Sequence, residues 1–204
     1  MAKAELEELL VPDPAALRDW LAEHHQTSPG VRLVLGKAGG SVTTLTWAMA
    51  VEELLCVGWI DGQAGKRDDE SWTIRVTPRR PTGLWSARNV GLVAKLDAEG
   101  RLLPAGRAQV EAAKADGRWG RAYAGPATTE VPDDLATAIA ADPAAQAMWD
   151  VLTRTNRFTL VHRVTTVKRA ETRARKITEA VAMLARGQTP YPQKARPVDP
   201  DARE

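Results

Sequence analysis

CVGWIDGQAGKRDDESWTIRVTPRRPTGLWSARN, residues 56–89, is the stretch of sequence that decides the fold. Residues 59–63 and residues 71–77 both read as strands, and the polar loop 64–70 separates them. Alternating side chains point to opposite faces of a strand, so we expect an antiparallel pair whose second strand has one apolar and one basic face. The apolar face would carry Trp72, Ile74 and Val76, and the basic face, open to solvent or a ligand, would carry Thr73, Arg75 and Thr77.

Helices and a further strand are predicted upstream of this pair. Asp13 is a suitable N-cap for a first helix, with Pro14 in its first turn. Alternation over residues 31–35 predicts a strand, and Thr46 is a candidate N-cap of a second helix that Gly58 would end.

Downstream of Pro81 the pattern is helix and turn. The expected helices span residues 84–96, 104–115, 132–140, 143–152, 156–168 and 171–186. The predicted fold class is α+β: a small, mostly antiparallel sheet packed by helices, with a helical C-terminal half. We expect an α+β domain over residues 1–125, a helical region 126–187 packed on it, and a flexible, proline-containing tail 188–204.

Composition is that of an ordinary globular protein. The 204 residues are 44% hydrophobic and 26% charged, the net charge is +2, and no apolar run approaches the roughly 20 residues that span a bilayer. The acidic segment MAKAELEELLVPDP lacks the features of an export signal, and the single Cys56 excludes an internal disulfide. We therefore expect a cytoplasmic protein.

Tryptophans, arginines and one isolated acid lie close together in the stretch that decides the fold. This combination is typical either of a thick core or of a ligand cleft with an apolar body and a few polar groups. The predicted cleft is lined by Trp59, Asp61, Trp72, Arg75, Arg79, Arg80, Trp85, Arg88 and Asn89.

The polar groups of this cleft have alternative roles. Asp61 follows apolar neighbours, so burial would raise its pKa and suit it to acid or base chemistry; the alternative is a structural acid that accepts backbone hydrogen bonds or pairs with an arginine. Arg79 and Arg80 precede a helix N-terminus and would bind an anion there. The alternative is that either of them pairs with Asp61 or with the acids at 68–70.

Sequence motifs for catalysis and for metals are missing. His24, His25 and His162 have no metal-ligand spacing, and no phosphate loop, dinucleotide fingerprint or nucleophile elbow is present. Cys56 has apolar neighbours that would make it inert. We predict no catalytic residue, metal or cofactor. Residues 154–176 contain eight Lys or Arg and one acid, which indicates either a solvated basic face or a nucleic-acid interface, and specific nucleic-acid binding is not expected.

Several segments resemble a known bacterial family, and they occur in order between about Trp20 and Gly187. They are GWIDGQ (58–63), TPRRPTGLWSARN (77–89), AGRAQVEAAKADGRW (105–119) and AETRARKI (170–177). They are similar to the bacteriocin-protection family, also called OmpD-associated or YdeI-like. The resemblance implies a small cytoplasmic bacterial protein linked to tolerance of bacteriocins or cationic antimicrobial peptides, with no established reaction.

Together, the residues and the resemblance predict a non-catalytic protein that binds a small-molecule or peptide ligand, or a partner, and contributes to this tolerance. Two other classes stay open. One is an enzyme that uses Asp61 as acid or base on an arginine-bound anionic substrate. The other is an electrostatic nucleic-acid binder that uses the basic C-terminal helices.

Overall fold

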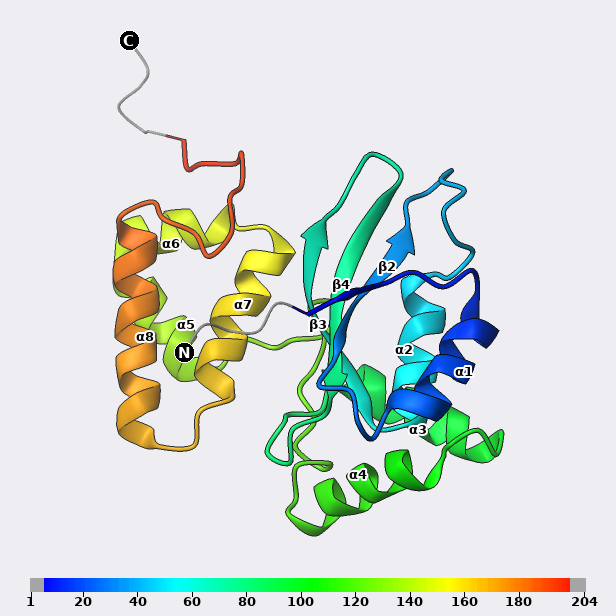
Figure 1. Ribbon diagram of the computed structural model, residues 1–204. Helices are drawn as coiled ribbons and strands as arrows, with labels where there is room; N and C mark the ends of the chain where they lie inside the picture. The colour runs from blue at the N-terminus through cyan, green and yellow to red at the C-terminus, as the bar shows by residue number, and fades with distance from the viewer. Residues whose placement is uncertain (1–5, 199–204) are drawn as a thin grey trace. The chain divides into compact units, whose positions relative to one another are not determined.

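The chain divides into two compact units. The computed structural model describes residues 6–198, and the units are Met1–Ala122 and Tyr123–Glu204, called here the N-terminal and C-terminal units (Figure 1). The predicted flexible tail is described up to Val198; residues 199–204, like residues 1–5 of the acidic N-terminal segment, lie outside the described part.

A four-stranded sheet forms the centre of the N-terminal unit. Its order is β1-β2-β4-β3, with β1 parallel to β2 and the other pairs antiparallel. The strands are β1 (Glu8–Leu9), β2 (Val31–Gly36), β3 (Trp59–Lys66) and β4 (Ser71–Pro78). The predicted α+β class is confirmed, and so is the antiparallel pair of β3 and β4. The predicted loop 64–70 was too long, because residues 64–66 continue β3 beyond a bulge.

Four helices belong to the N-terminal unit: α1 (Pro14–His24), α2 (Trp47–Cys56), α3 (Ala87–Ala98) and α4 (Pro104–Ala115). Asp13 and Thr46 are the N-caps of α1 and α2, as predicted; their side chains accept hydrogen bonds from Ala16 N at 2.9 Å and Met49 N at 3.3 Å. The predicted start of α3 at Leu84 was too early, because the Ser86 hydroxyl caps the helix by accepting from a backbone N–H in its first turn.

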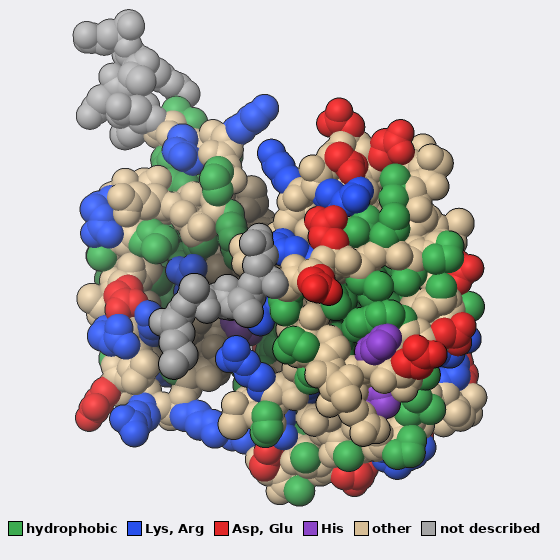
Figure 2. Space-filling view, in the orientation of Figure 1, with side chains coloured by type: hydrophobic (Ala, Val, Ile, Leu, Met, Phe, Trp, Pro, Cys, Tyr) green, Lys and Arg blue, Asp and Glu red, His purple; other side chains and the backbone are tan. Residues whose placement is uncertain are grey.

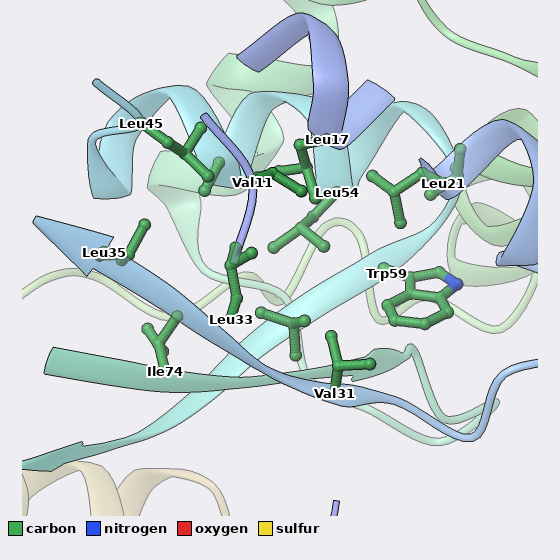
Figure 3. Close-up of a cluster of buried hydrophobic side chains, with 13 residues drawn as sticks. Val11, Leu17, Leu21, Val31, Leu33, Leu35, Leu45, Leu54, Trp59 and Ile74 are labelled. Carbon is green, nitrogen blue, oxygen red and sulfur yellow. The ribbon is translucent and has the colours of Figure 1, made fainter. Parts of the chain in front are cut away.

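The main hydrophobic cluster lies between the sheet and the helices α1 and α2 (Figure 3). Trp59 is 1% exposed within it, and its indole Nε1 donates to the carbonyl of His25 at 3.0 Å. A second cluster joins the other side of α2 to α3 and α4, and it contains Trp85, Val93 and Val110. Helix α2 is therefore buried on both sides.

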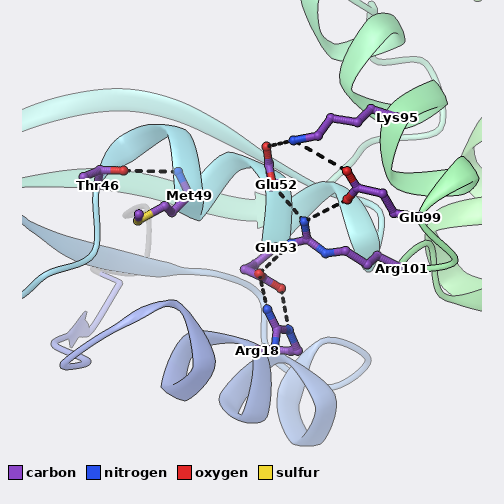
Figure 4. Close-up of polar contacts among 8 residues, drawn as sticks. All are labelled: Arg18, Thr46, Met49, Glu52, Glu53, Lys95, Glu99 and Arg101. Carbon is purple, nitrogen blue, oxygen red and sulfur yellow. Dashed lines mark hydrogen bonds and ion pairs between the residues drawn. The ribbon is translucent and has the colours of Figure 1, made fainter.

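A buried carboxylate on α2 links three parts of the N-terminal unit (Figure 4). Glu53 is 3% exposed; it accepts from Arg18 Nε and Nη2 at 2.9 and 2.7 Å and from Arg101 Nη2 at 2.8 Å. Arg101 also donates to Glu52 at 2.9 Å, and Lys95 donates to Glu52 at 3.0 Å. Hydrogen bonds from Lys95 and Arg101 lower the pKa of Glu52 below its usual value. We call these five residues the Glu53 network.

The C-terminal unit contains four helices around a separate core: α5 (Asp133–Ala140), α6 (Pro143–Asp150), α7 (Arg154–Thr165) and α8 (Ala170–Ala185). Arg173 on α8 makes two hydrogen bonds to the Asp134 carboxylate on α5, at 2.7 and 2.8 Å. All four helices were predicted. The prediction placed the end of α6 two residues too late and that of α7 three residues too late.

Gly106 marks a close contact between α4 and the end of α2. A Cβ at this position would overlap the carbonyl oxygen of Cys56 and lie 2.8 Å from that of Leu55. Gly106→Ala should therefore lower the free energy of unfolding by about 1–3 kcal/mol, because the helices must separate. Gly91→Ala is the control: its Cβ meets nothing within 4 Å in α3, so it should raise that free energy by roughly 0.5–1 kcal/mol. Urea unfolding measures the free energy of unfolding of both variants. Equal changes in the two variants would contradict the close contact at Gly106.

Removal of the charge at Glu53 should destabilise the N-terminal unit. Glu53→Gln leaves the Arg18 guanidinium without a carboxylate, while Arg101 keeps Glu52 and Glu99. We expect the free energy of unfolding to fall by about 2–4 kcal/mol, less than for a fully buried ion pair because Arg18 is partly exposed. Glu111→Gln removes a surface pair with Lys114 at 2.8 Å and should cost less than about 0.5 kcal/mol. Urea unfolding followed by tryptophan fluorescence distinguishes them, and a Glu53 variant as stable as the control would show that the network is dispensable.

Candidate functional site

Three side chains from different elements meet at the surface of the N-terminal unit. Trp47 begins α2, and its indole Nε1 donates to Asp61 Oδ2 on β3 at 3.0 Å. The guanidinium carbon of Arg88, in the first turn of α3, lies 4.0 Å from the centre of the Trp47 ring. Trp47 is 37% exposed, so the group is open to solvent. We call Trp47, Asp61 and Arg88 the Trp47 cluster.

Local sequence signals place each member of the cluster. The Thr46 cap fixes the first turn of α2 and so places Trp47 at its start, and the Ser86 cap does the same for Arg88 in α3. Asp61 lies opposite Val76 of β4, just before the bulge in β3. Two of the three side chains therefore come from capped first turns of helices, and the third comes from a paired position of β3.

The Trp47 cluster combines three kinds of recognition group. A tryptophan ring attracts a cation to its face, a carboxylate binds ammonium or guanidinium groups, and an arginine binds anions. Among the residues that the structure describes, neither Asp61 nor Arg88 forms an ion pair; Asp61 accepts from the Trp47 indole and Arg88 stacks on its ring. The arrangement suits a peptide or another ligand that carries charge next to an apolar group.

The three predicted tryptophans lie in two different hydrophobic clusters. Trp59 lies in the cluster beneath α1 and α2, and Trp72 packs at the edge of that cluster. Trp85 is 2% exposed in the other cluster, where the guanidinium of Arg79 lies 3.8 Å from its ring centre. Trp59 and Trp85 are therefore buried as core residues, as in the first of the two alternatives for this stretch.

The remaining predicted residues occupy different environments. Arg79 is buried, and its Nη1 donates to the carbonyl of Leu84 at 2.9 Å. Asn89 is also buried, Arg75 is partly buried and Arg80 is exposed. That these residues bind a ligand stays a prediction. Asp61 is half-buried, and its hydrogen-bond partner is the indole of Trp47.

Sequence reasoning missed the part that Trp47 plays. The position directly after the Thr46 cap was the available signal, because a residue there begins a helix and often remains accessible. Nothing in the sequence indicated that Asp61, on a strand 14 residues later, would accept from its indole.

Side chains that could together hold a metal ion are not assembled in the described part of the chain. No group of three or more His, Cys, Asp or Glu residues between residues 6 and 198 is placed to hold a metal ion. Burial, together with the nearby charge of Glu53, raises the pKa of the Cys56 thiol to about 11. Burial also lowers the pKa of His162, whose ring packs edge-on to Tyr123.

The basic stretch 154–176 is partly neutralised by nearby acids. Arg173 binds Asp134, while Arg175 and Lys176 bind Glu179 at 2.6 Å. On the face drawn in Figure 2, the Lys and Arg side chains of the C-terminal unit are scattered among other side chains. These ion pairs offset part of the positive charge of the stretch, so a count of its own residues overstates how basic this surface is. None of the helices in the described part has the length and apolar character needed to cross a membrane.

Cys56 should react slowly while the protein is folded. At pH 8 a rise in pKa from 9.0 to about 11 lowers the thiolate fraction roughly hundredfold, and burial restricts access further. Labelling with Ellman's reagent should therefore be slow in buffer, faster as the pH rises toward 11, and fast at pH 8 after unfolding in guanidinium chloride. Equal rates in the folded and unfolded protein at pH 8 would contradict the burial of this thiol.

Comparison with known families gives two separate matches. Residues 9–109 match a family model described as a domain of unknown function (DUF8412), and this segment contains GWIDGQ and TPRRPTGLWSARN. Residues 128–187, which contain α5 to α8, match the model described as "Bacteriocin-protection, YdeI or OmpD-Associated". No curated protein and no solved structure matches the chain. The match over residues 128–187 is partial, and it supports the predicted resemblance to the bacteriocin-protection, YdeI or OmpD-associated family for the C-terminal helices.

Proposed function

We propose that this protein contributes to tolerance of bacteriocins or cationic antimicrobial peptides by binding a ligand, without catalysing a reaction. The match of residues 128–187 to the bacteriocin-protection family carries this proposal. The second part, that binding takes place at the Trp47 cluster, is supported by the exposure of Trp47 and by the two charges beside it that have no ion-pair partner in the described residues.

A cationic peptide fits the chemistry of the Trp47 cluster. A lysine or arginine side chain of the peptide would hydrogen-bond the Asp61 carboxylate and stack on the Trp47 ring. Arg88 now occupies a ring face, so the incoming cation would displace it or use the opposite face. Arg88 would then be free to bind a peptide carbonyl or carboxylate.

The expected strength of a single anchor is modest. An exposed cation–π contact contributes about 0.5–1 kcal/mol and a hydrogen bond to a charged group about 1.5–3 kcal/mol. Micromolar affinity requires about 8 kcal/mol, so a ligand must also contact neighbouring surface. The Trp47 cluster would orient the ligand and select for positive charge rather than supply the whole affinity.

Charge removal at Asp61 tests the proposal. Asp61→Asn keeps the size and the acceptor for Trp47 but removes the charge, so binding of a cationic peptide should weaken roughly tenfold. Asp69→Asn, an exposed acid in the neighbouring loop, is the matched control and should behave as wild type. The measurements are calorimetric peptide binding, thermal melting, and survival of a bacterial host expressing each variant under peptide challenge.

The outcomes separate the two parts of the proposal. Wild-type protein that protects no better than an empty vector would refute the tolerance function. Protection by wild type that Asp61→Asn retains at unchanged stability would refute the Trp47 cluster as the binding site. Protection that falls only in step with a lower melting temperature would give Asp61 a structural role.

A further inference from the structure

The segment that follows α8 folds back onto the start of α7. Gly187 has φ +65° and ends the helix, and its N–H donates to Leu184 O at 2.8 Å. Figure 1 draws the following residues in orange-red as a loop that passes α6 and the start of α7. The sequence predicted a flexible tail from residue 188 onward, yet residues 191–193 are hydrogen-bonded to the C-terminal unit.

Asn156 binds the main chain of this segment. Its Nδ2 donates to Tyr191 O at 3.0 Å, and its Oδ1 accepts from Tyr191 N at 2.9 Å. One carboxamide thus pairs with the N–H and C=O of a single residue, as a neighbouring strand would. Asn156 is 1% exposed, while Tyr191 is 54% exposed. The contact therefore depends on the backbone of residue 191 and hardly on its side chain.

The side chain of Gln193 binds beside the Tyr191 backbone, at the start of α7. Its Oε1 accepts from Thr153 N at 3.0 Å and from Asn156 Nδ2 at 2.7 Å, and its Nε2 donates to Val151 O at 3.1 Å. A glutamate could not donate to the Val151 carbonyl, and an apolar side chain would satisfy none of these groups. The site therefore selects glutamine two residues after the residue whose backbone is bound.

We propose that Val151, Thr153 and Asn156 form a binding site for an extended peptide of another protein, and that residues 191–193 of this chain occupy it as a built-in competitor. The ligand would be a proline-flanked segment with glutamine two residues after the residue that Asn156 binds. This site lies within the 128–187 family match and its present occupant lies beyond it. The proposal is independent of the Trp47 cluster.

The bound segment has the properties of a displaceable ligand. Pro190 and Pro192 restrict it to extended conformations, which lowers the entropy lost on binding, and the same holds for a proline-flanked peptide from elsewhere. The contacts join uncharged groups, so water can replace them when the segment leaves. A short tether gives the tail an effective concentration of about millimolar, so a competing peptide gains access when it binds more tightly or when the tail is released.

Tyr191→Pro releases the tail without changing the site. Proline removes the N–H that Asn156 accepts, whereas Tyr191→Ala keeps it and removes only an exposed side chain. The probe is a fluorescent peptide with the sequence of residues 187–198, GQTPYPQKARPV, added to full-length protein. Fluorescence anisotropy should show at least roughly tenfold tighter binding to Tyr191→Pro than to Tyr191→Ala or wild type, because the site is no longer occupied by the tail.

Peptide variants then test the specificity. A peptide with alanine in place of the glutamine of Gln193 should lose most of its affinity for Tyr191→Pro. Equal affinity of Tyr191→Pro and Tyr191→Ala, or of the two peptides, would overturn the proposal. Circular dichroism checks that the variants keep their helices; if Tyr191→Pro does not, Gln193→Ala in the protein releases the tail instead. A wild-type dimer in gel filtration that Tyr191→Pro abolishes would also overturn it, because the occupant would then be a second copy.

Discussion

The N-terminal unit depends on the burial of one charge, the Glu53 carboxylate. A carboxylate in a nearly dry position is tolerated only when its oxygens are satisfied, and here guanidinium groups from α1 and from the segment after α3 satisfy them. Because α2 is apolar on both sides of this charge, the hydrophobic clusters hold the helix while Arg18 and Arg101 fix its register against its neighbours. The start of α2, and with it Trp47, takes its place from this arrangement.

Much of the fold follows from local chemistry in the sequence. The N-caps at Asp13 and Thr46 and the alternation in β2 and β4 were sufficient to place the corresponding elements, since caps and periodicity act within a few residues. Strand β1 has only two residues and therefore no period to detect, and it pairs in parallel with β2 across a helix. Its existence is a consequence of tertiary packing.

The candidate site was less predictable than the fold. A tryptophan and an arginine that stack on each other have the same sequence signature in a core and in a cleft. Here Arg79 stacks on Trp85 in a buried position, while Arg88 stacks on Trp47 at the surface. Only the positions of the covering helices distinguish these two pairs. The charge of the basic stretch 154–176 was overestimated for a similar reason. Asp134 and Glu179 lie outside this stretch in the sequence, but they form ion pairs with Arg173 and Arg175 in the folded unit.

Each of the two units encloses a hydrophobic core of its own, and each is matched by a different family model. A two-state description requires a single cooperative transition, which separate cores do not guarantee. If the two cores unfold in separate transitions, the unfolding of this chain is described by two free energies rather than one. Tryptophans report on both, since Trp59 lies in the first core and Trp149 in the second. A substitution that melts one unit would then leave the other unit folded, and a single melting temperature would conceal the difference.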